Sequence, residues 1–142
     1  MDNELTTTNA GNLTGSRGRV LVVEDDHYLC CLLGERLELA GYQTVLSNNG
    51  LEGLRALEEK QPDLAIIDLN MPVMSGFRLL RLLRGRRSPD QPRVPVIVIS
   101  GDDPQEIMDL VVETKPDDYL QKPFAAEQLL EKVGLLMARI SA

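Results

Sequence analysis

Four short segments of the chain place polar side chains at the ends of apolar runs. The polar residues are Glu24-Asp25-Asp26, Asp68, Ser100 and Lys122. If the apolar runs are parallel strands of one sheet, their carboxyl ends meet at one edge, where open α/β sheets bind ligands. Carboxylates, a hydroxyl and an ammonium group would then face one crevice. This combination predicts a divalent-metal site built around one reactive aspartate.

The acidic triplet Glu24-Asp25-Asp26 follows the apolar run Val20–Val23. Acids stabilise the N-terminus of a helix, and we expect Asp26 to act as such a cap. Three carboxylates after a buried strand also bring like charges together at low dielectric, which is unfavourable. A hard cation would relieve that repulsion, and Mg²⁺ is typically held by one or two carboxylates together with water. The triplet therefore predicts a Mg²⁺ site.

Asp68 ends the apolar run Leu64–Ile67, where an aspartate can simply cap the following turn. A carboxylate in this place can also act as a nucleophile and form an aspartyl phosphate. With Mg²⁺ neutralising charge, phosphoryl transfer needs little beyond positioning and electrostatic stabilisation. Asp68 is therefore the candidate for the reactive aspartate.

Lys122 and Ser100 supply the groups that complement this aspartate. Most lysines are solvated, but Lys122 ends a strand and precedes Pro123, which is a poor place for a free surface chain. Its ammonium group can pair with Asp68 at rest and with a phosphoryl oxygen after transfer. Ser100 offers a hydroxyl donor to another phosphoryl oxygen. We expect the Lys122–Pro123 bond to be cis, because X-Pro turns at strand ends are places where such bonds occur.

Strand and helix patterns alternate from Arg19 onward. The apolar runs predict strands at Val20–Val23, Gln43–Leu46, Leu64–Ile67, Val96–Ile99 and Tyr119–Leu120. Helical spacing predicts helices that include Leu29–Ala40, Leu51–Leu57, Leu79–Leu83, Pro104–Val111 and Leu129–Ile140.

Five β/α units in succession predict one doubly wound (βα)5 α/β domain with a five-stranded parallel sheet and helices on both faces. The flavodoxin-like strand order 2-1-3-4-5 fits five strands best. In this order the first and third strands are neighbours. Glu24, Asp25 and Asp68 would therefore lie together.

The chain has 142 residues, of which 43% are hydrophobic and 26% charged, as in an ordinary soluble globular domain. A net charge of −7 argues against direct nucleic-acid binding by the domain. There is neither an apolar run long enough to span a bilayer nor a signal peptide, so we expect no membrane contact and a cytoplasmic location. Residues 1–18, rich in Thr, Asn and Gly, are expected to be a disordered leader before a domain at 19–142.

The motifs together closely resemble the receiver domains of two-component response regulators. They are Val-Val-Glu-Asp-Asp, Ile-Ile-Asp-Leu-Asn-Met-Pro with Gly76, Ile-Ser-Gly and Tyr-Leu-Gln-Lys-Pro-Phe, in the order of that family. The resemblance covers roughly Arg19 to Ile140. It implies that Asp68 accepts a phosphoryl group from a histidine kinase or a histidine phosphotransfer protein.

The resemblance also implies a metal shell for Mg²⁺. Asp25 and Asp68 would be direct ligands, and Glu24 would act through water. The backbone carbonyl of Asn70 would complete the protein's share of the coordination.

The resemblance also implies a conformational switch, in which certain side chains rearrange when Asp68 is phosphorylated. Ser100 would be the switch hydroxyl and Lys122 the phosphate partner. Tyr119 holds the position of the switch aromatic, whose ring turns inward when the hydroxyl moves toward the phosphate. Packing of that ring on the helix from Pro104 is the simpler interpretation of the same residue.

Three local features depart from the family pattern or add to it. Lys115-Pro116 stands where many receivers have Gly-Ala, and should stiffen the exit of the preceding helix. Ser100 replaces the common Thr, which keeps the hydroxyl and loses a methyl group. The basic segment 84–87, with Arg93 beyond it, is interpreted as a solvated helix end in preference to a partner-binding patch.

Three functions are compatible with these residues. The leading one is a signalling module that promotes its own phosphorylation and dephosphorylation and is not an enzyme with a separate substrate. A phosphohydrolase of the haloacid-dehalogenase kind is discounted, because its Asp-x-Asp motif lies on the first strand and Asp68 here is followed by Leu69-Asn70. A degenerate receiver that acts only as a scaffold is opposed by the intact set Asp25, Asp68, Ser100 and Lys122.

Phosphorylation should favour one of two arrangements of a face formed by the helix from Pro104, the strand Tyr119–Leu120 and the helix Leu129–Ile140. This face would bind a downstream protein or the chain's own output domain. A homodimer through the same face is a further possibility.

Overall fold

The computed structural model describes residues 16–86 and 93–141. The expected leader up to residue 15 and Arg87 of the basic segment lie outside the described residues, as do the side chains of Arg86, Leu110 and Val111. Among the residues that are described, no helix is long and apolar enough to cross a membrane.

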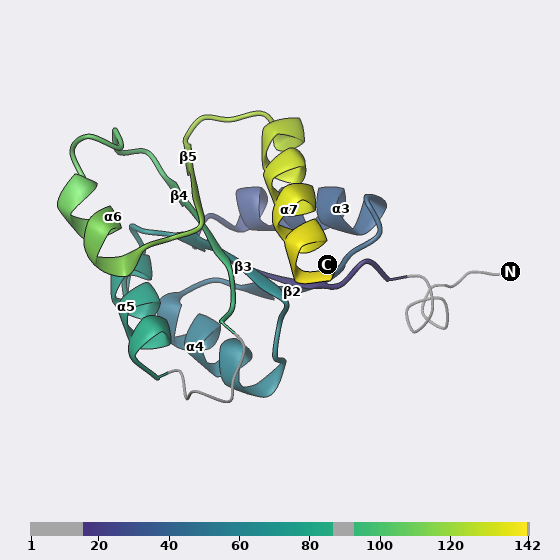
Figure 1. The fold of residues 1–142 in the computed structure, drawn as a ribbon, viewed down its shortest axis with the longest axis horizontal. Coiled ribbons are helices and arrows are strands. Elements are labelled where there is room, and N and C mark those ends of the chain that lie inside the picture. Colours follow the sequence, from purple (N-terminus) through teal and green to yellow (C-terminus); the bar gives the residue numbers. More distant parts are fainter. Residues whose placement is uncertain (1–15, 87–92, 142) are drawn as a thin grey trace, which may run out of the picture.

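Strands and helices alternate along the described chain (Figure 1). The strands are β1 Arg19–Val23, β2 Gln43–Ser47, β3 Leu64–Asp68, β4 Val96–Ser100 and β5 Asp118–Gln121. The helices are α3 His27–Leu39, α4 Gly50–Glu59, α5 Gly76–Arg86, α6 Met108–Thr114 and α7 Ala126–Ser141. Each strand and helix expected from the sequence is present.

The strands form one parallel sheet in the order β2-β1-β3-β4-β5, which confirms the predicted topology. The pairing of β1 with β3 runs up to Val23 opposite Ile67, so Glu24 and Asp68 follow the last pair at the same level. Ser100 ends β4 at this edge too. The register thus gathers the polar residues at the carboxyl ends of the strands.

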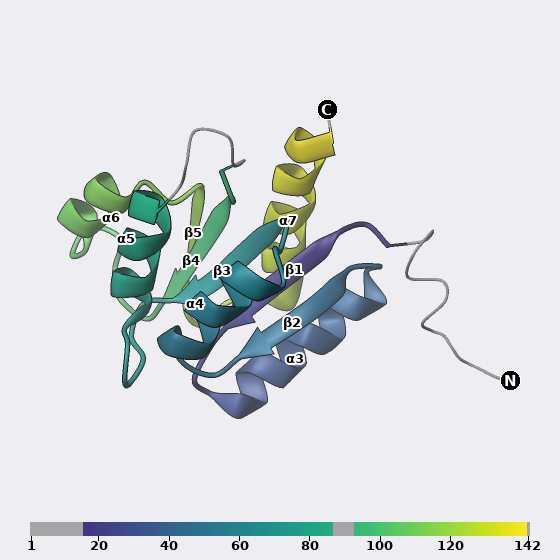
Figure 2. The same cartoon turned by 90° about the horizontal axis from the view of Figure 1, so that it is seen from below.

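Helices cover both faces of the sheet, with α3 and α7 on one face and α4 and α5 on the other (Figure 2). Side chains of a strand point to opposite faces in turn, so β1 contributes to both cores. Val20 and Val22 pack with α3 and α7, whereas Leu21 and Val23 pack with α4 and α5. This double burial explains why the central strands are continuous apolar runs.

Helix α4 packs on the sheet through small residues together with Leu54 and Leu57, two of the three leucines that marked this helix in the sequence. Its buried residues are Gly50, Gly53 and Ala56. Leu51, the third of these leucines, is 45% exposed. A Cβ atom on Gly53 would lie 2.9 Å from a methyl carbon of Val23, so this close approach of α4 to β1 requires glycine.

Helix α6 begins at Met108 and not near Pro104 as expected. The preceding residues form a turn that is held by Asp103. Its carboxylate accepts a hydrogen bond from the Gln105 N–H at 2.8 Å, and its carbonyl accepts one from the Glu106 N–H at 2.9 Å. Local bonds of this kind compete with the helical pattern and delay the first helical turn.

Arg84 and Arg93 do not form the solvated helix end that was expected from the sequence. Both guanidinium groups reach the Asp117 carboxylate, at 3.3 Å from Arg84 and 2.6 Å from Arg93. Asp117 also accepts from the Val96 N–H at 2.7 Å, and Arg84 donates to the Thr114 carbonyl at 3.2 Å. This cluster, the Asp117 brace, joins α5, the start of β4 and the connection from α6 to β5.

Residues 16–18, expected to belong to the disordered leader, contact the domain. The Arg17 N–H donates to the Gly41 carbonyl at 2.9 Å, and its guanidinium carbon lies 4.7 Å from the ring centroid of Tyr42. Gly18 lies so close to α7 that a Cβ atom there would be 2.3 Å from Cε of Met137. The packed part of the chain therefore begins ahead of β1.

Candidate functional site

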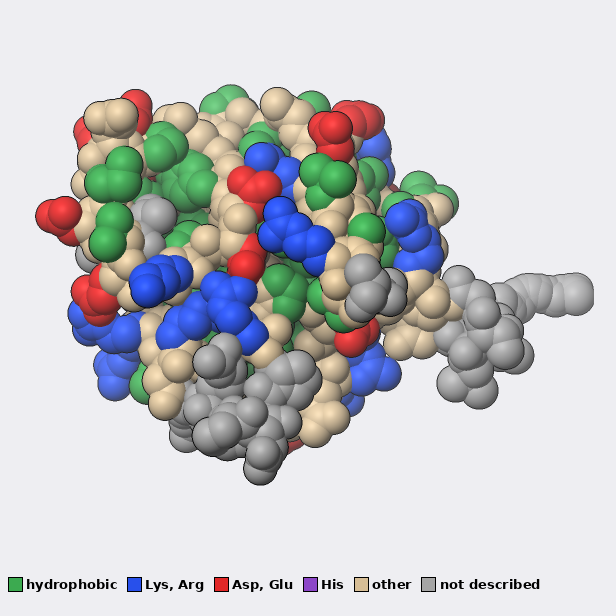
Figure 3. Space-filling view, in the orientation of Figure 1, with side chains coloured by type: hydrophobic (Ala, Val, Ile, Leu, Met, Phe, Trp, Pro, Cys, Tyr) green, Lys and Arg blue, Asp and Glu red, His purple; other side chains and the backbone are tan. Residues whose placement is uncertain are grey.

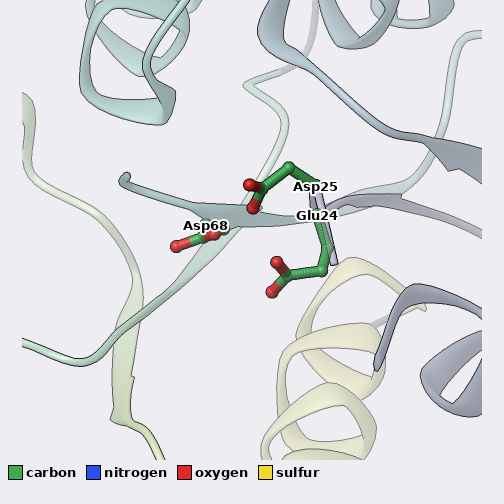
Figure 4. Close-up of side chains that lie close together, drawn as sticks. All are labelled: Glu24, Asp25 and Asp68. Atoms are coloured by element: carbon green, nitrogen blue, oxygen red, sulfur yellow. The ribbon is translucent and has the colours of Figure 1, made fainter. Parts of the chain in front are cut away.

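Three carboxylates from the ends of β1 and β3 lie together at the carboxyl edge of the sheet (Figure 4). Glu24, Asp25 and Asp68 each offer one oxygen, and these oxygens lie within 4.8 Å of one another. Glu24 is fully buried and Asp68 is 3% exposed, while Asp25 is the most exposed of the three. The strand order thus brings together the acids that were selected from the sequence.

Local hydrogen bonds fix the acidic turn between β1 and α3. Asp26 caps α3 as predicted, because its carboxylate accepts from the Leu29 N–H at 3.1 Å. The Asp26 N–H in turn donates to a Glu24 carboxylate oxygen at 3.1 Å. The Asn48 side chain donates to the Glu24 carbonyl at 3.1 Å and so ties the turn to the end of β2. The Asp26 carboxylate therefore caps α3, whereas the Asp25 carboxylate lies beside those of Glu24 and Asp68.

Lys122 extends its ammonium group into this cluster from the residue after β5. Nζ lies 2.9 Å from Oε1 of Glu24 and 3.5 Å from Oδ2 of Asp68. Asp68 was the partner expected at rest; the structure shows both acids as partners, with Glu24 the closer. The Lys122–Pro123 peptide bond is cis, as expected.

The charges in the cluster shift the titration of its members. Burial, together with repulsion from the Glu24 carboxylate, raises the pKa of Asp68 to about 7, although the nearby Lys122 opposes the rise. Burial alone would lower the pKa of Lys122, but its contacts with Glu24 and Asp68 outweigh burial and raise that pKa. The described cluster thus holds three carboxylates against one ammonium group, an excess of negative charge that a cation would stabilise.

The backbone around Asp68 leaves no room for a side chain at Gly76, the first residue of α5. A Cβ atom there would lie 1.8 Å from the carbonyl oxygen of Asp68, and the Gly76 N–H donates to the Leu69 carbonyl at 3.0 Å. The Asn70 N–H donates to Oδ1 of Asp68 at 3.2 Å. Together these contacts fix the strand end that carries the Asp68 carboxylate.

Ser100 and Tyr119 are linked through a residue that was not selected from the sequence, Asp102. The buried Ser100 hydroxyl donates to Oδ2 of Asp102 at 3.2 Å, and the Asn70 amide donates to the same oxygen at 3.1 Å. The Tyr119 hydroxyl donates to the Asp102 carbonyl. The signal available in the sequence was the pair Asp102-Asp103 after strand four, at the edge where the other acids lie.

The donor set fits a hard divalent cation. Three carboxylates contribute oxygen atoms within a few ångströms, and oxygen is the ligand that Mg²⁺ prefers. The described residues of the cluster contribute neither imidazole nor thiolate, the donors typical of zinc. The arrangement can therefore hold Mg²⁺ beside a buried carboxylate that also faces an ammonium group.

Comparison with known proteins identifies the class of protein that this fold and site define. A family model for the response regulator receiver domain matches residues 20–134, and the chain belongs to this family.

Two curated relatives from Mycobacterium tuberculosis illustrate the similarity. The transcriptional regulatory protein PrrA is 36% identical over 121 residues, which cover 85% of this chain and 50% of PrrA. The response regulator MprA is 33% identical over 121 residues, which cover 85% of this chain and 51% of MprA. The chain thus spans about half the length of the curated relatives it matches.

Solved receiver domains share the fold. The receiver domain of a Francisella response regulator superposes with a TM-score of 0.78 at 30% identity, covering 87% of this chain and 98% of that domain. The receiver domain of a Pseudomonas aeruginosa sensor histidine kinase has a TM-score of 0.75 at 25% identity, and the match covers 85% of this chain and 98% of that domain. That second structure has a magnesium ion coordinated in its active site cleft.

Proposed function

We propose that this chain is the phospho-accepting receiver of a two-component phosphorelay. Asp68 takes a phosphoryl group from a histidine kinase or a histidine phosphotransfer protein, and Mg²⁺ assists. The observation that carries the proposal is the placement of the buried Asp68 carboxylate between the acids Glu24 and Asp25 and the ammonium group of Lys122. This is the arrangement that an aspartyl phosphate requires: a cation site on one side and a fixed positive charge on the other.

In the proposed reaction, an oxygen of Asp68 attacks the phosphorus atom of a phosphohistidine. The O–P bond forms while the N–P bond breaks, and its electron pair returns to the imidazole of the donor. Asp25, Asp68 and the backbone carbonyl of Asn70 would hold Mg²⁺, with Glu24 acting through water. The bound ion would neutralise charge on the phosphoryl oxygens.

Lys122 and Ser100 are proposed to stabilise the product. Lys122 already lies 3.5 Å from Asp68, so its ammonium group can pair with a phosphoryl oxygen with little movement. Ser100 ends β4, next to β3, and can donate its hydroxyl to another phosphoryl oxygen. Water would later cleave the acyl phosphate and return the Asp68 carboxylate, so the module needs no substrate other than the phosphodonor.

The output is proposed to be a rearrangement of the face formed by α6, β5 and α7, in which Tyr119 takes part. Figure 3 looks onto this side of the molecule, where hydrophobic side chains gather over α6. Met108 and Val112 of α6 are 47% and 62% exposed. This face would bind a downstream protein, an output domain or a second copy of the chain.

The test is phosphoryl labelling by a small donor. We expect acetyl phosphate with Mg²⁺ to add one phosphoryl group by mass spectrometry, and beryllofluoride with Mg²⁺ to bind. Both responses should vanish in Asp68→Asn and after chelation of Mg²⁺. Asp103→Asn, which removes an exposed acid from the same edge of the sheet, is the matched control and should respond like the wild type.

Two other outcomes would contradict the proposal. A wild-type protein that takes neither reagent would act as a scaffold. Rapid turnover of many phosphate esters would indicate a hydrolase.

A further inference from the structure

Asp102 forms hydrogen bonds with residues of three neighbouring segments: Asn70 after β3, Ser100 at the end of β4 and Tyr119 in β5. Its N–H donates to the Ser100 hydroxyl oxygen at 3.1 Å, and its carboxylate accepts from Ser100 at 3.2 Å and from Asn70 at 3.1 Å. Its carbonyl accepts from the Tyr119 hydroxyl. The N–H, the carboxylate and the carbonyl of this one residue thus all take part in hydrogen bonds with these segments.

The direction of the bond between Ser100 and Asp102 decides what Ser100 can do. An ionised carboxylate only accepts hydrogen bonds, so the single proton of the Ser100 hydroxyl is the one donated to Asp102. A hydroxyl that donates its hydrogen bond to Asp102 cannot at the same time donate to a phosphoryl oxygen on Asp68. The two hydrogen bonds exclude each other.

Resting on the proposed function, we propose that Asp102 is a positioning residue that holds the Ser100 hydroxyl in the unphosphorylated arrangement. The bond to Asp102 must break before Ser100 can turn to the phosphoryl group. Asp102 therefore sets part of the free-energy difference between the two arrangements, because it stabilises only one of them. Its own negative charge adds repulsion toward a phosphoryl group that carries nearly two negative charges.

The same residue links this release to Tyr119. When Ser100 leaves the Asp102 carboxylate, the turn that contains Asp102 loses a hydrogen bond to the last residue of β4. The carbonyl that accepts from the Tyr119 hydroxyl belongs to that turn. The turn leads directly into α6. Asp102 thereby connects the Ser100 hydroxyl to the start of the α6, β5 and α7 face.

The experiment measures beryllofluoride affinity with saturating Mg²⁺. Asp102→Ala should bind beryllofluoride roughly tenfold more tightly than the wild type, which corresponds to the lower bound for removing a hydrogen bond to a charged group. Asp102→Asn keeps an acceptor without the charge and should fall between the two. Asp103→Ala removes the neighbouring exposed acid and should bind like the wild type.

A double-mutant cycle then separates a hydrogen-bond effect from loss of negative charge alone. If Asp102 acts through Ser100, Asp102→Ala in a Ser100→Ala background should gain no more than roughly twofold. An equal gain in both backgrounds, or equal gains for Asp102→Ala and Asp103→Ala, would overturn the proposal. Thermal unfolding of each variant checks that it is folded. If Asp102→Ala is not folded, the same comparisons are made with Asp102→Asn.

Failure of this proposal is distinguishable from failure of the proposed function. A wild-type protein that binds no beryllofluoride overturns both. A wild-type protein that binds it, together with an Asp102→Ala variant of unchanged affinity, overturns only the role of Asp102.

Discussion

The ammonium nitrogen of Lys122 lies 2.9 Å from Oε1 of Glu24, a carboxylate that is fully buried. Lys122 itself is 27% exposed, so the pair joins the interior of the domain to its surface. The ion pair thus joins residues that follow two distant strands of the sheet, since β1 and β5 are separated by β3 and β4.

Removal of the lysine should therefore destabilise the fold as well as the site. Lys122→Met leaves a buried carboxylate without its partner, and we expect a loss of ~1–3 kcal/mol in the free energy of unfolding at pH 8 without Mg²⁺. Lys132→Met is the control, because it breaks a partly exposed pair with Asp118 and should cost under ~0.5 kcal/mol. Urea titration measures both, and equal losses would show that the buried position of Glu24 has no energetic effect.

The raised pKa of Asp68 predicts a pH-dependent stability in the metal-free protein. The folded pKa is about 7 against an ordinary 3.8, so between these pH values the folded state holds the proton more tightly. This contribution to stability is fully present below about pH 4 and is lost as the pH rises through 7.

Asp68→Asn has no proton to lose at this position. Its stability relative to the wild type should therefore rise by on the order of 4 kcal/mol between pH 4 and pH 8. Thermal or urea unfolding in a chelator measures the difference, with Asp103→Asn as the control. A constant difference across this range would contradict the raised pKa.

Two glycines of α5 give a matched pair for the backbone around Asp68. Gly76→Ala would force a Cβ atom against the Asp68 carbonyl, and we expect a loss of ~2 kcal/mol or more together with loss of phosphoryl labelling. A Cβ atom on Gly85 would meet no described heavy atom within 4 Å, so Gly85→Ala should be neutral or stabilise by up to ~1 kcal/mol. Similar effects at both positions would argue against a steric cause.

The Asp117 brace predicts a difference between two arginines of α5. Arg84 is 19% exposed and bonds to several carbonyls as well as Asp117, so Arg84→Ala should cost ~2 kcal/mol. Arg81 is 58% exposed and pairs with the exposed Glu113, so Arg81→Ala should cost clearly less than Arg84→Ala. Hydrogen exchange at the end of α6 should quicken in the first variant alone.

Strand order and the acidic site were predictable from the sequence, because both depend on simple periodic features. A buried parallel strand is a continuous apolar run, and the residue after it must emerge at the carboxyl edge. Glu24, Asp25 and Asp68 could be placed together on that basis alone.

Contacts between distant side chains were not predictable in the same way. The distances from Nζ of Lys122 to its two partners are 2.9 Å for Glu24 and 3.5 Å for Asp68. The spacing of residues in a sequence cannot predict so small a difference. Arg84 resembles any basic residue at a helix end until the fold brings Asp117 beside it. The buried glycines of α4 could not be predicted because glycine adds nothing to a hydrophobic pattern, although here it allows the helix to approach the sheet closely.

The contact of Gly18 with Met137 has a practical consequence for experiments. It places the start of β1 next to the last turns of α7, at the edge of the sheet away from the three acids. If the protein is attached to a solid support through a linker near residue 16 or residue 141, the acidic crevice will therefore face the solution. Immobilised protein can then present the same face to a phosphodonor whichever end is tethered.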